Sequence, residues 1–181
     1  QTSESSCKND CNAGSYIPAD KSSCTKCPEG KFQNQSSQLL CLDCGTGKYN
    51  DQIGGSESNC RDCNDGKYNS LTGQTSESSC KNDCNAGSYI PSDKSSCTKC
   101  PEGQFQNKDN QPSCDECILG TYNEQTGSAA ETACIDCVDG TYTDQNGQAS
   151  CKNDCNAGSY ILADKSACFE CVKGKFQDEI D

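Results

Sequence analysis

The cysteines of this 181-residue chain form close pairs that recur at a nearly constant interval. Each pair is separated by two or three residues, and each begins 17 to 20 residues after the one before. The pairs lie at positions 7/11, 24/27, 41/44, 60/63, 80/84, 97/100, 114/117, 134/137, 151/155 and 168/171. A fixed period of this kind is typical of a repeat architecture and not of a single globular domain.

One short phrase follows every cysteine pair: two residues, a glycine, one more residue and then an aromatic. Of the aromatic residues in the chain, only Phe169 lies outside this slot. The slot holds Tyr16, Phe32, Tyr49, Tyr68, Tyr89, Phe105, Tyr122, Tyr142, Tyr160 and Phe176. We expect each of these rings to cover a neighbouring disulfide.

The composition shows why cysteine must replace an apolar core. Leu, Ile, Val and Phe make up only about a tenth of the chain and the net charge is −12, which alone would indicate disorder. However, 20 of the 181 residues are Cys, a proportion that marks a disulfide scaffold. Such scaffolds persist in oxidising compartments, so we expect a secreted or cell-surface protein.

A longer period lies above the short one. The stretch CKNDCNAGSYI occurs at 7–17, 80–90 and 151–161, which is once in every four short repeats. This predicts a first four-repeat block at 1–73, a second at 74–146 and the first half of a third at 147–181, with recent duplication as the origin. Because the chain begins in mid-repeat, we expect it to be part of a longer protein.

Turn residues predict the local structure of one repeat. In Cys27-Pro28-Glu29-Gly30 the positions of Pro and Gly fit a type I turn, and the aromatic two residues later begins an extended segment. A return to the next cysteine pair would complete a small irregular β-hairpin. The predicted fold is therefore an elongated rod of tandem disulfide-rich hairpins with little or no helix, in which each repeat touches mainly its neighbours.

Two other uses of cysteine pairs need to be weighed. Paired Cys-x2-Cys motifs can bind zinc, but a four-thiolate site needs two pairs, and the intervals show no two-repeat alternation. A redox Cys-x-x-Cys would be a single motif in an α/β context, whereas ten pairs in succession indicate a structural role. Crossed disulfides between adjacent pairs would also impose an alternation.

The pairing that treats every repeat alike joins the second Cys of one pair to the first Cys of the next. Each such link closes a loop of roughly 15 residues and stabilises the fold by about 3 kcal/mol. The expected bridges are Cys11–Cys24, Cys27–Cys41, Cys44–Cys60, Cys63–Cys80, Cys84–Cys97, Cys100–Cys114, Cys117–Cys134, Cys137–Cys151 and Cys155–Cys168. Cys7 and Cys171 have no partner in this pairing, and we expect them to bridge to further repeats of the same chain or of a neighbouring molecule.

The stretches CPEGKFQNQSSQLLCLDC (27–44) and CPEGQFQNKDNQPSCDEC (100–117) resemble the repeat of ephrin-receptor-like cysteine-rich regions. They are also similar to the first loop of tumour-necrosis-factor-receptor cysteine-rich domains. The resemblance implies bridges Cys27–Cys41 and Cys100–Cys114 directly and the other bridges by repetition. Long arrays of such repeats also look like extracellular proteins of single-celled eukaryotes.

Little in the sequence points to catalysis or to a cofactor. The chain has no His, so the commonest general base is missing, and we expect no enzyme activity and no cofactor. Equivalent aspartates recur at Asp10, Asp83 and Asp154, and at Asp20, Asp93 and Asp164. We interpret them as a solvated surface, with weak calcium binding as the alternative. A pI near 4.3 makes nucleic acid a poor partner, and no apolar run is long enough to span a membrane.

One N-glycosylation sequon is present, Asn34-Gln35-Ser36, and we expect its loop to be exposed and to carry a glycan. The many Ser and Thr residues would also permit O-glycans.

Near-identical repeats favour a structural extracellular protein, a component of a fibre, surface coat or cell-surface projection that self-associates. The alternative is the ligand-binding ectodomain or the stalk of a receptor. For that alternative the divergent segment 114–150, with Ile118, Leu119, Ile135 and Val138, is the first place to look.

Overall fold

The computed structural model describes residues 11–20 and 23–175 of the chain. These residues divide into two compact units. The first contains the described residues up to Asn82 together with Pro91–Ser96, and the second contains Asp83–Ile90 and the described residues from Cys97 onward. The four-repeat blocks are a period in the sequence and stay a prediction.

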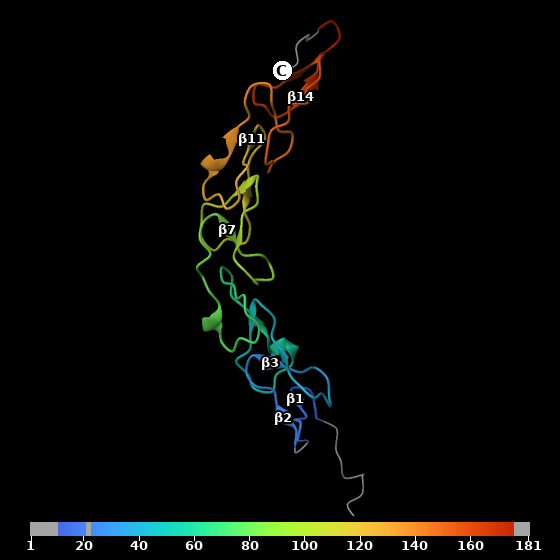
Figure 1. Ribbon diagram of the computed structural model, residues 1–181, viewed down its shortest axis with the longest axis vertical. Helices are drawn as coiled ribbons and strands as arrows, with labels where there is room; N and C mark the ends of the chain where they lie inside the picture. Colours follow the sequence, from blue (N-terminus) through green and yellow to red (C-terminus); the bar gives the residue numbers. More distant parts are fainter. Residues whose placement is uncertain (1–10, 21–22, 176–181) are drawn as a thin grey trace, which may run out of the picture. The chain divides into compact units, whose positions relative to one another are not determined.

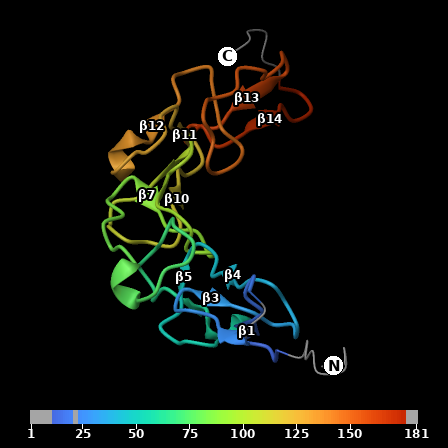
Figure 2. The same cartoon turned by 60° about the horizontal axis from the view of Figure 1, so that its bottom comes forward.

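The secondary structure consists of very short antiparallel hairpins joined by long loops (Figure 1). Seven hairpins each pair two strands, and β13 and β14 lie side by side in Figure 2 as well. The pairs are β1 (Ser15–Tyr16) with β2 (Thr25–Lys26), β3 (Lys31–Phe32) with β4 (Leu42–Asp43), β5 (Lys48–Tyr49) with β6 (Arg61–Asp62), β7 (Ser88–Tyr89) with β8 (Thr98–Lys99), β9 (Gln104–Phe105) with β10 (Asp115–Glu116), β11 (Thr121–Tyr122) with β12 (Ile135–Asp136), and β13 (Ser159–Ile161) with β14 (Cys168–Glu170). Two further hairpins are reduced to single bridges, Tyr68 with Lys81 and Tyr142 with Lys152.

The turn that leads into β3 lies one residue later than the sequence predicts. In the second repeat the N–H of Lys31 donates to the carbonyl of Pro28, so the turn runs from 28 to 31 and Gly30 is its third residue. Gly30 has φ +76°, and Glu29 is not among the residues with positive φ. This combination is a type II turn, which requires glycine at the third position, so the expected type I turn is wrong.

The described helices are single 3-10 turns, and they account for the longer repeats. They are η2 (Glu57–Asn59), η3 (Glu77–Ser79) and η4 (Glu131–Ala133), each ending directly before a cysteine. The disulfides that close these three loops span 16, 17 and 17 residues, whereas the other six span 13 or 14. The extra residues are therefore taken up by one helical turn, and the hairpin itself does not change.

Nine serial disulfides stand at the bases of the hairpins, and each joins the second Cys of one pair to the first Cys of the next. They are the nine bridges that the repeat spacing implies. The largest fully buried side chains are cysteines together with Asn50, Asn123 and Thr143. The predicted fold class, disulfide-rich hairpin repeats with almost no helix, is confirmed. The expectation of a rod concerns the placement of the two compact units and stays a prediction.

Candidate functional site at the junctions between repeats

The most strongly recurring arrangement in the structure is the junction between one repeat and the next. We number the repeats by their disulfides, from repeat 1 (11–24) to repeat 9 (155–168). The intervening repeats are 2 (27–41), 3 (44–60), 4 (63–80), 5 (84–97), 6 (100–114), 7 (117–134) and 8 (137–151).

The first contact of a junction is made by the turn glycine. Its N–H donates to the carbonyl of the residue that follows the aromatic in the next repeat, at 2.7–2.8 Å. This bond joins Gly14 to Gln33, Gly30 to Asn50, Gly47 to Asn69, Gly87 to Gln106 and Gly103 to Asn123. At the next junction Gly120 donates instead to the side-chain hydroxyl of Thr143, at 2.7 Å.

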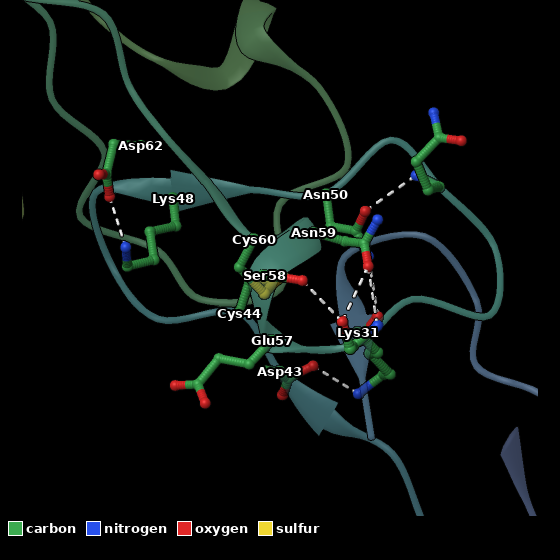
Figure 3. Close-up of a disulfide and its surroundings, with 12 residues drawn as sticks. Lys31, Asp43, Cys44, Lys48, Asn50, Glu57, Ser58, Asn59, Cys60 and Asp62 are labelled. Atoms are coloured by element: carbon green, nitrogen blue, oxygen red, sulfur yellow. Dashed lines mark hydrogen bonds and ion pairs between the residues drawn. A yellow bond between two sulfur atoms is a disulfide. The ribbon is translucent and has the colours of Figure 1, made fainter. Parts of the chain in front are cut away.

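In six of the nine described repeats the residue after the aromatic is a buried polar side chain, whereas repeats 1, 5 and 9 have Ile there. Asn50 is fully buried; its Nδ2 donates to the carbonyl of Lys31 in the preceding repeat, and its Oδ1 accepts from the N–H of Gln52 (Figure 3). Asn123 repeats both contacts with Gln104 and Gln125. Because a buried polar group is costly unless it is hydrogen-bonded, these satisfied amides fix the spacing of the stack.

A third contact runs back from the long loop of a repeat to the preceding repeat. Here a backbone N–H donates to the carbonyl of the cysteine that opens the preceding repeat, at 2.7–2.8 Å. The donors and acceptors are Ser37 to Cys11, Gly54 to Cys27, Gly73 to Cys44, Asn110 to Cys84, Gly127 to Cys100 and Gly147 to Cys117. At two other junctions a lysine side chain makes this contact.

Contacts also reach the second neighbour along the chain. A Cβ added to Gly14 would lie 2.1 Å from the carbonyl oxygen of Gly54, two repeats further on, and one added to Gly103 would lie 1.9 Å from that of Gly147. The same approach joins Gly30 to Gly73, Gly47 to Asp93, Gly87 to Gly127 and Gly120 to Asp164. The expectation that repeats touch mainly their immediate neighbours needs one addition, because the absence of a side chain at the turn glycine also brings repeat n against repeat n+2.

The aromatic slot packs on a disulfide, as expected, and the disulfide belongs to the next repeat. Tyr49 of repeat 3 forms a buried cluster with Cys63 and Cys80 of repeat 4. Phe105 of repeat 6 likewise lines a small hollow of about 120 Å³ with Cys117 and Cys134 of repeat 7. Tyr49, Phe105 and Tyr142 are each 8% exposed, whereas Tyr160 is 43% exposed. Phe176 lies outside the described residues.

The remaining predicted site residues do not gather at one place. Cys171 is half-buried and carries a free thiol, and Cys7 lies outside the described residues, so both intermolecular bridges stay predictions. Asn34 is exposed; its Oδ1 accepts from the N–H of Glu57 at 2.7 Å, and its Nδ2 donates to the Glu57 carboxylate. Its glycosylation stays a prediction.

The repeated aspartates make local contacts. Asp93 and Asp164 each accept the N–H and the hydroxyl of the serine two residues on, Ser95 and Ser166. The bonds from Ser166 hold the pKa of Asp164 below its usual value. Asp10 lies outside the described residues, and Asp20 and Asp83 each have an interaction partner.

Asp154 takes part in a small polar cluster at the hairpin of repeat 8. It accepts a hydrogen bond from the Tyr142 hydroxyl at 2.8 Å, and this bond raises the pKa of Tyr142. Beside it, Lys152 pairs with Asp144 at 2.6 Å, which lowers the pKa of Asp144 and raises that of Lys152. The cluster ties the two sides of the hairpin together, since Lys152 is the bridge partner of Tyr142.

Neither a metal site nor a membrane-spanning helix is found within the described residues. Within 11–20 and 23–175, no group of three or more His, Cys, Asp or Glu side chains is arranged to hold a metal ion. With Cys171 as the sole free thiol in that part of the chain, the zinc alternative has no ligand set there. No helix among the described residues has the length and apolar character needed to cross a bilayer.

Hairpins closed by serial disulfides and stacked through their turns define an extracellular-type cysteine-rich repeat protein. Residues 14–59 and 87–134, just over half of the chain, match the family described as "Tyrosine-protein kinase ephrin type A/B receptor-like". The chain therefore belongs to the ephrin type A/B receptor-like family of cysteine-rich repeats. Repeats of this kind, with this density of disulfides, are typical of secreted or cell-surface proteins.

Two curated proteins are similar to the chain over a longer stretch. A segment of 127 residues, 70% of the chain, is 29% identical to the Mus musculus protein "Signal peptide, CUB and EGF-like domain-containing protein 2". A segment of 120 residues, 66% of the chain, is 25% identical to the Homo sapiens protein of the same name. The matched segments span only 11% and 10% of those two proteins.

Sequence reasoning missed the buried polar residue after the aromatic. Gln33, Asn50, Asn69, Gln106, Asn123 and Thr143 are at most 5% exposed. The signal was present in the sequence, since this slot is an amide in five of the nine described repeats. In an acidic chain rich in Asn and Gln, however, such residues look like surface.

Proposed function

We propose that the protein is an extracellular structural repeat protein, a glycosylated component of a fibre, surface coat or cell-surface projection. The observation that carries the proposal is the recurrence of two backbone contacts at most of the described junctions, one from the turn glycine to the next repeat and one from the long loop back to the preceding repeat. A filament or lattice needs equivalent contacts at regular intervals, and these repeats supply them.

Further features support a non-enzymatic, self-associating role. The chain contains no His, so the usual general base is missing. The half-buried thiol of Cys171 would extend the serial disulfides into a following repeat or a neighbouring molecule. Asn34 is exposed, so its side chain is accessible to glycosylation.

Negative-stain imaging of the native material, purified without reductant, tests the proposal. Long filaments or ordered sheets that disassemble after reduction and alkylation are the expected result. Single short particles at every protein concentration would contradict it. Treatment with an N-glycosidase, with an Asn34→Gln chain as the control, tests the glycan separately.

A ligand-binding ectodomain or receptor stalk is the second candidate, and one observation favours it. Repeats 7 and 8 expose Ile118 (65%), Leu119 (43%), Ile135 (52%) and Val138 (67%). The equivalent positions of repeats 3 and 4 hold Gly45, Thr46, Arg61 and Asn64. Single particles in the imaging experiment would favour this reading, because apolar side chains that distinguish one pair of repeats from its counterpart suit a single partner better than a lattice.

A further inference from the structure

At two junctions a lysine ammonium occupies the place of the backbone donor. Lys94 Nζ, from the loop of repeat 5, donates to the carbonyl of Cys63 at 2.6 Å and to Asp65 Oδ1 at 2.8 Å, all within the first compact unit. In the second unit Lys165 Nζ, from the loop of repeat 9, donates to the carbonyl of Cys137 and lies 3.1 Å from Asp139 Oδ1. The lysine side chains are 22% and 26% exposed, so their stems are largely covered.

The backbone of these two loops explains why a side chain is needed. The N–H of Lys94 donates to Pro91 and that of Lys165 donates to Leu162, both at 2.8 Å, so each N–H closes its own turn. Neither is therefore available to the cysteine of the preceding repeat. Both lysines have positive φ, 54° and 57°, at the loop position that holds glycine in repeats 3, 4, 7 and 8. Ser37 and Asn110 also have positive φ at this position, but their backbone N–H groups reach the preceding cysteine, so the two lysines differ in making this contact with a side chain.

The turns that receive these ammonium groups are also distinctive. Asp65 and Asp139 occupy the third position of a Cys-x-Asp-Gly turn. In the other turns of the described chain this position holds Ala13, Glu29, Thr46, Ala86, Glu102, Leu119, Ala157 or Lys173. An Asp-Lys-Ser loop therefore meets an aspartate in both cases, and the aspartate is found at no other described turn.

We propose that this contact is a recognition element that fixes how a loop seats on the turn of the preceding repeat. An Asp-Lys-Ser loop seats on a Cys-x-Asp-Gly turn, and the partner that the turn fits is a primary ammonium group from such a loop. The inference goes beyond the proposed function and does not depend on it, since either a filament or a receptor stalk would need its repeats held at a fixed spacing.

The two parts of the contact differ in strength. The bond from an ammonium to a carbonyl is charge-assisted and is made by a largely covered lysine. The side chains of Asp65 and Asp139 are fully exposed, at 102% and 101%, so their attraction is screened by solvent and contributes less. The lysine provides most of the binding, and the carboxylate provides selectivity.

The backbone of each lysine extends the same junction. The carbonyl of Lys165 accepts the N–H of Thr143 at 3.0 Å, and that of Lys94 accepts the N–H of Asn69 at 3.0 Å. Thr143 is fully buried. Hydrogen exchange of the Thr143 amide in the whole chain therefore reports on this junction directly.

Four variants measured by hydrogen exchange test the proposal. Lys165→Met is expected to speed exchange at Thr143 roughly tenfold, which corresponds to one charged hydrogen bond, and Asp139→Asn about twofold. Lys165→Arg is expected to stay within about twofold of the native rate because its charge is kept. Lys48→Met, which removes an ammonium of repeat 3 bonded to Asp62, is the matched control and leaves Thr143 unchanged.

A fifth variant separates the effect of the ammonium contact from the effect of the positive φ at Lys165. Lys165→Gly removes the backbone strain together with the ammonium. The proposal expects exchange at Thr143 to remain faster than in the native chain. Slower exchange in Lys165→Gly, an unchanged rate in Lys165→Met, or an equal increase in Lys48→Met would each overturn it.

Selectivity is tested by exchanging the residues at the third position of the turns of repeats 8 and 3. Asp139→Thr gives repeat 8 the residue found in repeat 3, and it is expected to speed exchange as much as Asp139→Asn does. Thr46→Asp adds a carboxylate to repeat 3, whose Cys44 carbonyl already accepts the N–H of Gly73, and is expected to change nothing. A slower rate at the repeat 3 junction in Thr46→Asp would show that the carboxylate stabilises any junction, and it would contradict the proposed selectivity.

Discussion

Repeats 3 and 7 hold the same place in two successive blocks, and comparing them separates what the fold needs from what it tolerates. Their junction residues agree: Gly47 and Gly120 at the turn, Asn50 and Asn123 after the aromatic, and a disulfide at the base. Both glycines lie against a carbonyl two repeats on, and both amides are buried and satisfied.

The surfaces of these two repeats differ. Repeat 3 carries two ion pairs across or beside its hairpin, Lys48 with Asp62 at 2.5 Å (Figure 3) and Arg61 with Asp51 at 3.2 Å. Repeat 7 has Thr121 and Ile135 in place of Lys48 and Arg61. Its hairpin keeps the same register nonetheless, with Tyr122 opposite Ile135 as Tyr49 is opposite Arg61. The junction therefore holds the repeat together, and the charged surface is free to change.

The turn glycines should give the largest effect, and the same effect in both repeats. In Gly47→Ala the new Cβ would lie 2.1 Å from the carbonyl oxygen of Asp93, and in Gly120→Ala it would lie 2.2 Å from that of Asp164. We expect each to lower the free energy of unfolding by about 4 kcal/mol or more, because backbone must move and φ is positive. Urea denaturation would measure it.

Gly45→Ala is the matched control for that comparison. Gly45 is in the same turn but has nothing within 4 Å of an added Cβ. A loss of stability as large as that of Gly47→Ala would show that the turn itself, and not the approach of the distant repeat, is responsible.

The disulfides should come next in size. Replacing both cysteines of Cys44–Cys60, or both of Cys117–Cys134, by Ala is expected to cost about 3 kcal/mol, since the loops closed are of similar length. Native-state hydrogen exchange within each repeat would show it. If the cost is confined to repeat 3, the two repeats are not equivalent and the comparison fails.

The buried amides should follow. Asn50→Leu and Asn123→Leu each leave a carbonyl of the preceding repeat and a local N–H without a partner. The expected loss is about 2 kcal/mol in both repeats. Gln52→Leu, at an exposed position of the same loop, is the control and should lie within about 0.5 kcal/mol of the native chain. Equal losses of unfolding free energy at positions 50 and 52 would show that the buried amide of Asn50 makes no special contribution.

The ion pairs should have the smallest effect. Arg61→Ile gives repeat 3 the residue of repeat 7, and we expect a change in unfolding free energy of less than about 0.5 kcal/mol, because the pair with Asp51 is solvent-exposed. The converse change, Ile135→Arg, should be equally small. A loss above about 1 kcal/mol in Arg61→Ile would mean that repeat 3 depends on its surface charges.

The sequence allowed some of these features to be predicted and concealed others. The interval between cysteine pairs, without any alternation, was enough to imply hairpin repeats and serial bridges. The turn at Cys27-Pro28-Glu29-Gly30 was misplaced by one residue, because a proline and a glycine two positions apart fit more than one turn. The approach of Gly14 to Gly54 depends on how repeats stack, which no spacing within one repeat reveals. The buried role of Asn50 was hidden because asparagine is usually exposed.

The fully buried Asn50, Asn123 and Thr143 have a thermodynamic consequence for the whole protein. Exposing apolar surface on unfolding raises the heat capacity, whereas exposing polar groups lowers it. A chain whose fully buried side chains are amides, a hydroxyl and sulfur should therefore unfold with a small heat-capacity increment for its length. Its free energy of unfolding should then depend on temperature along a flatter, less curved line than that of a domain with an apolar core.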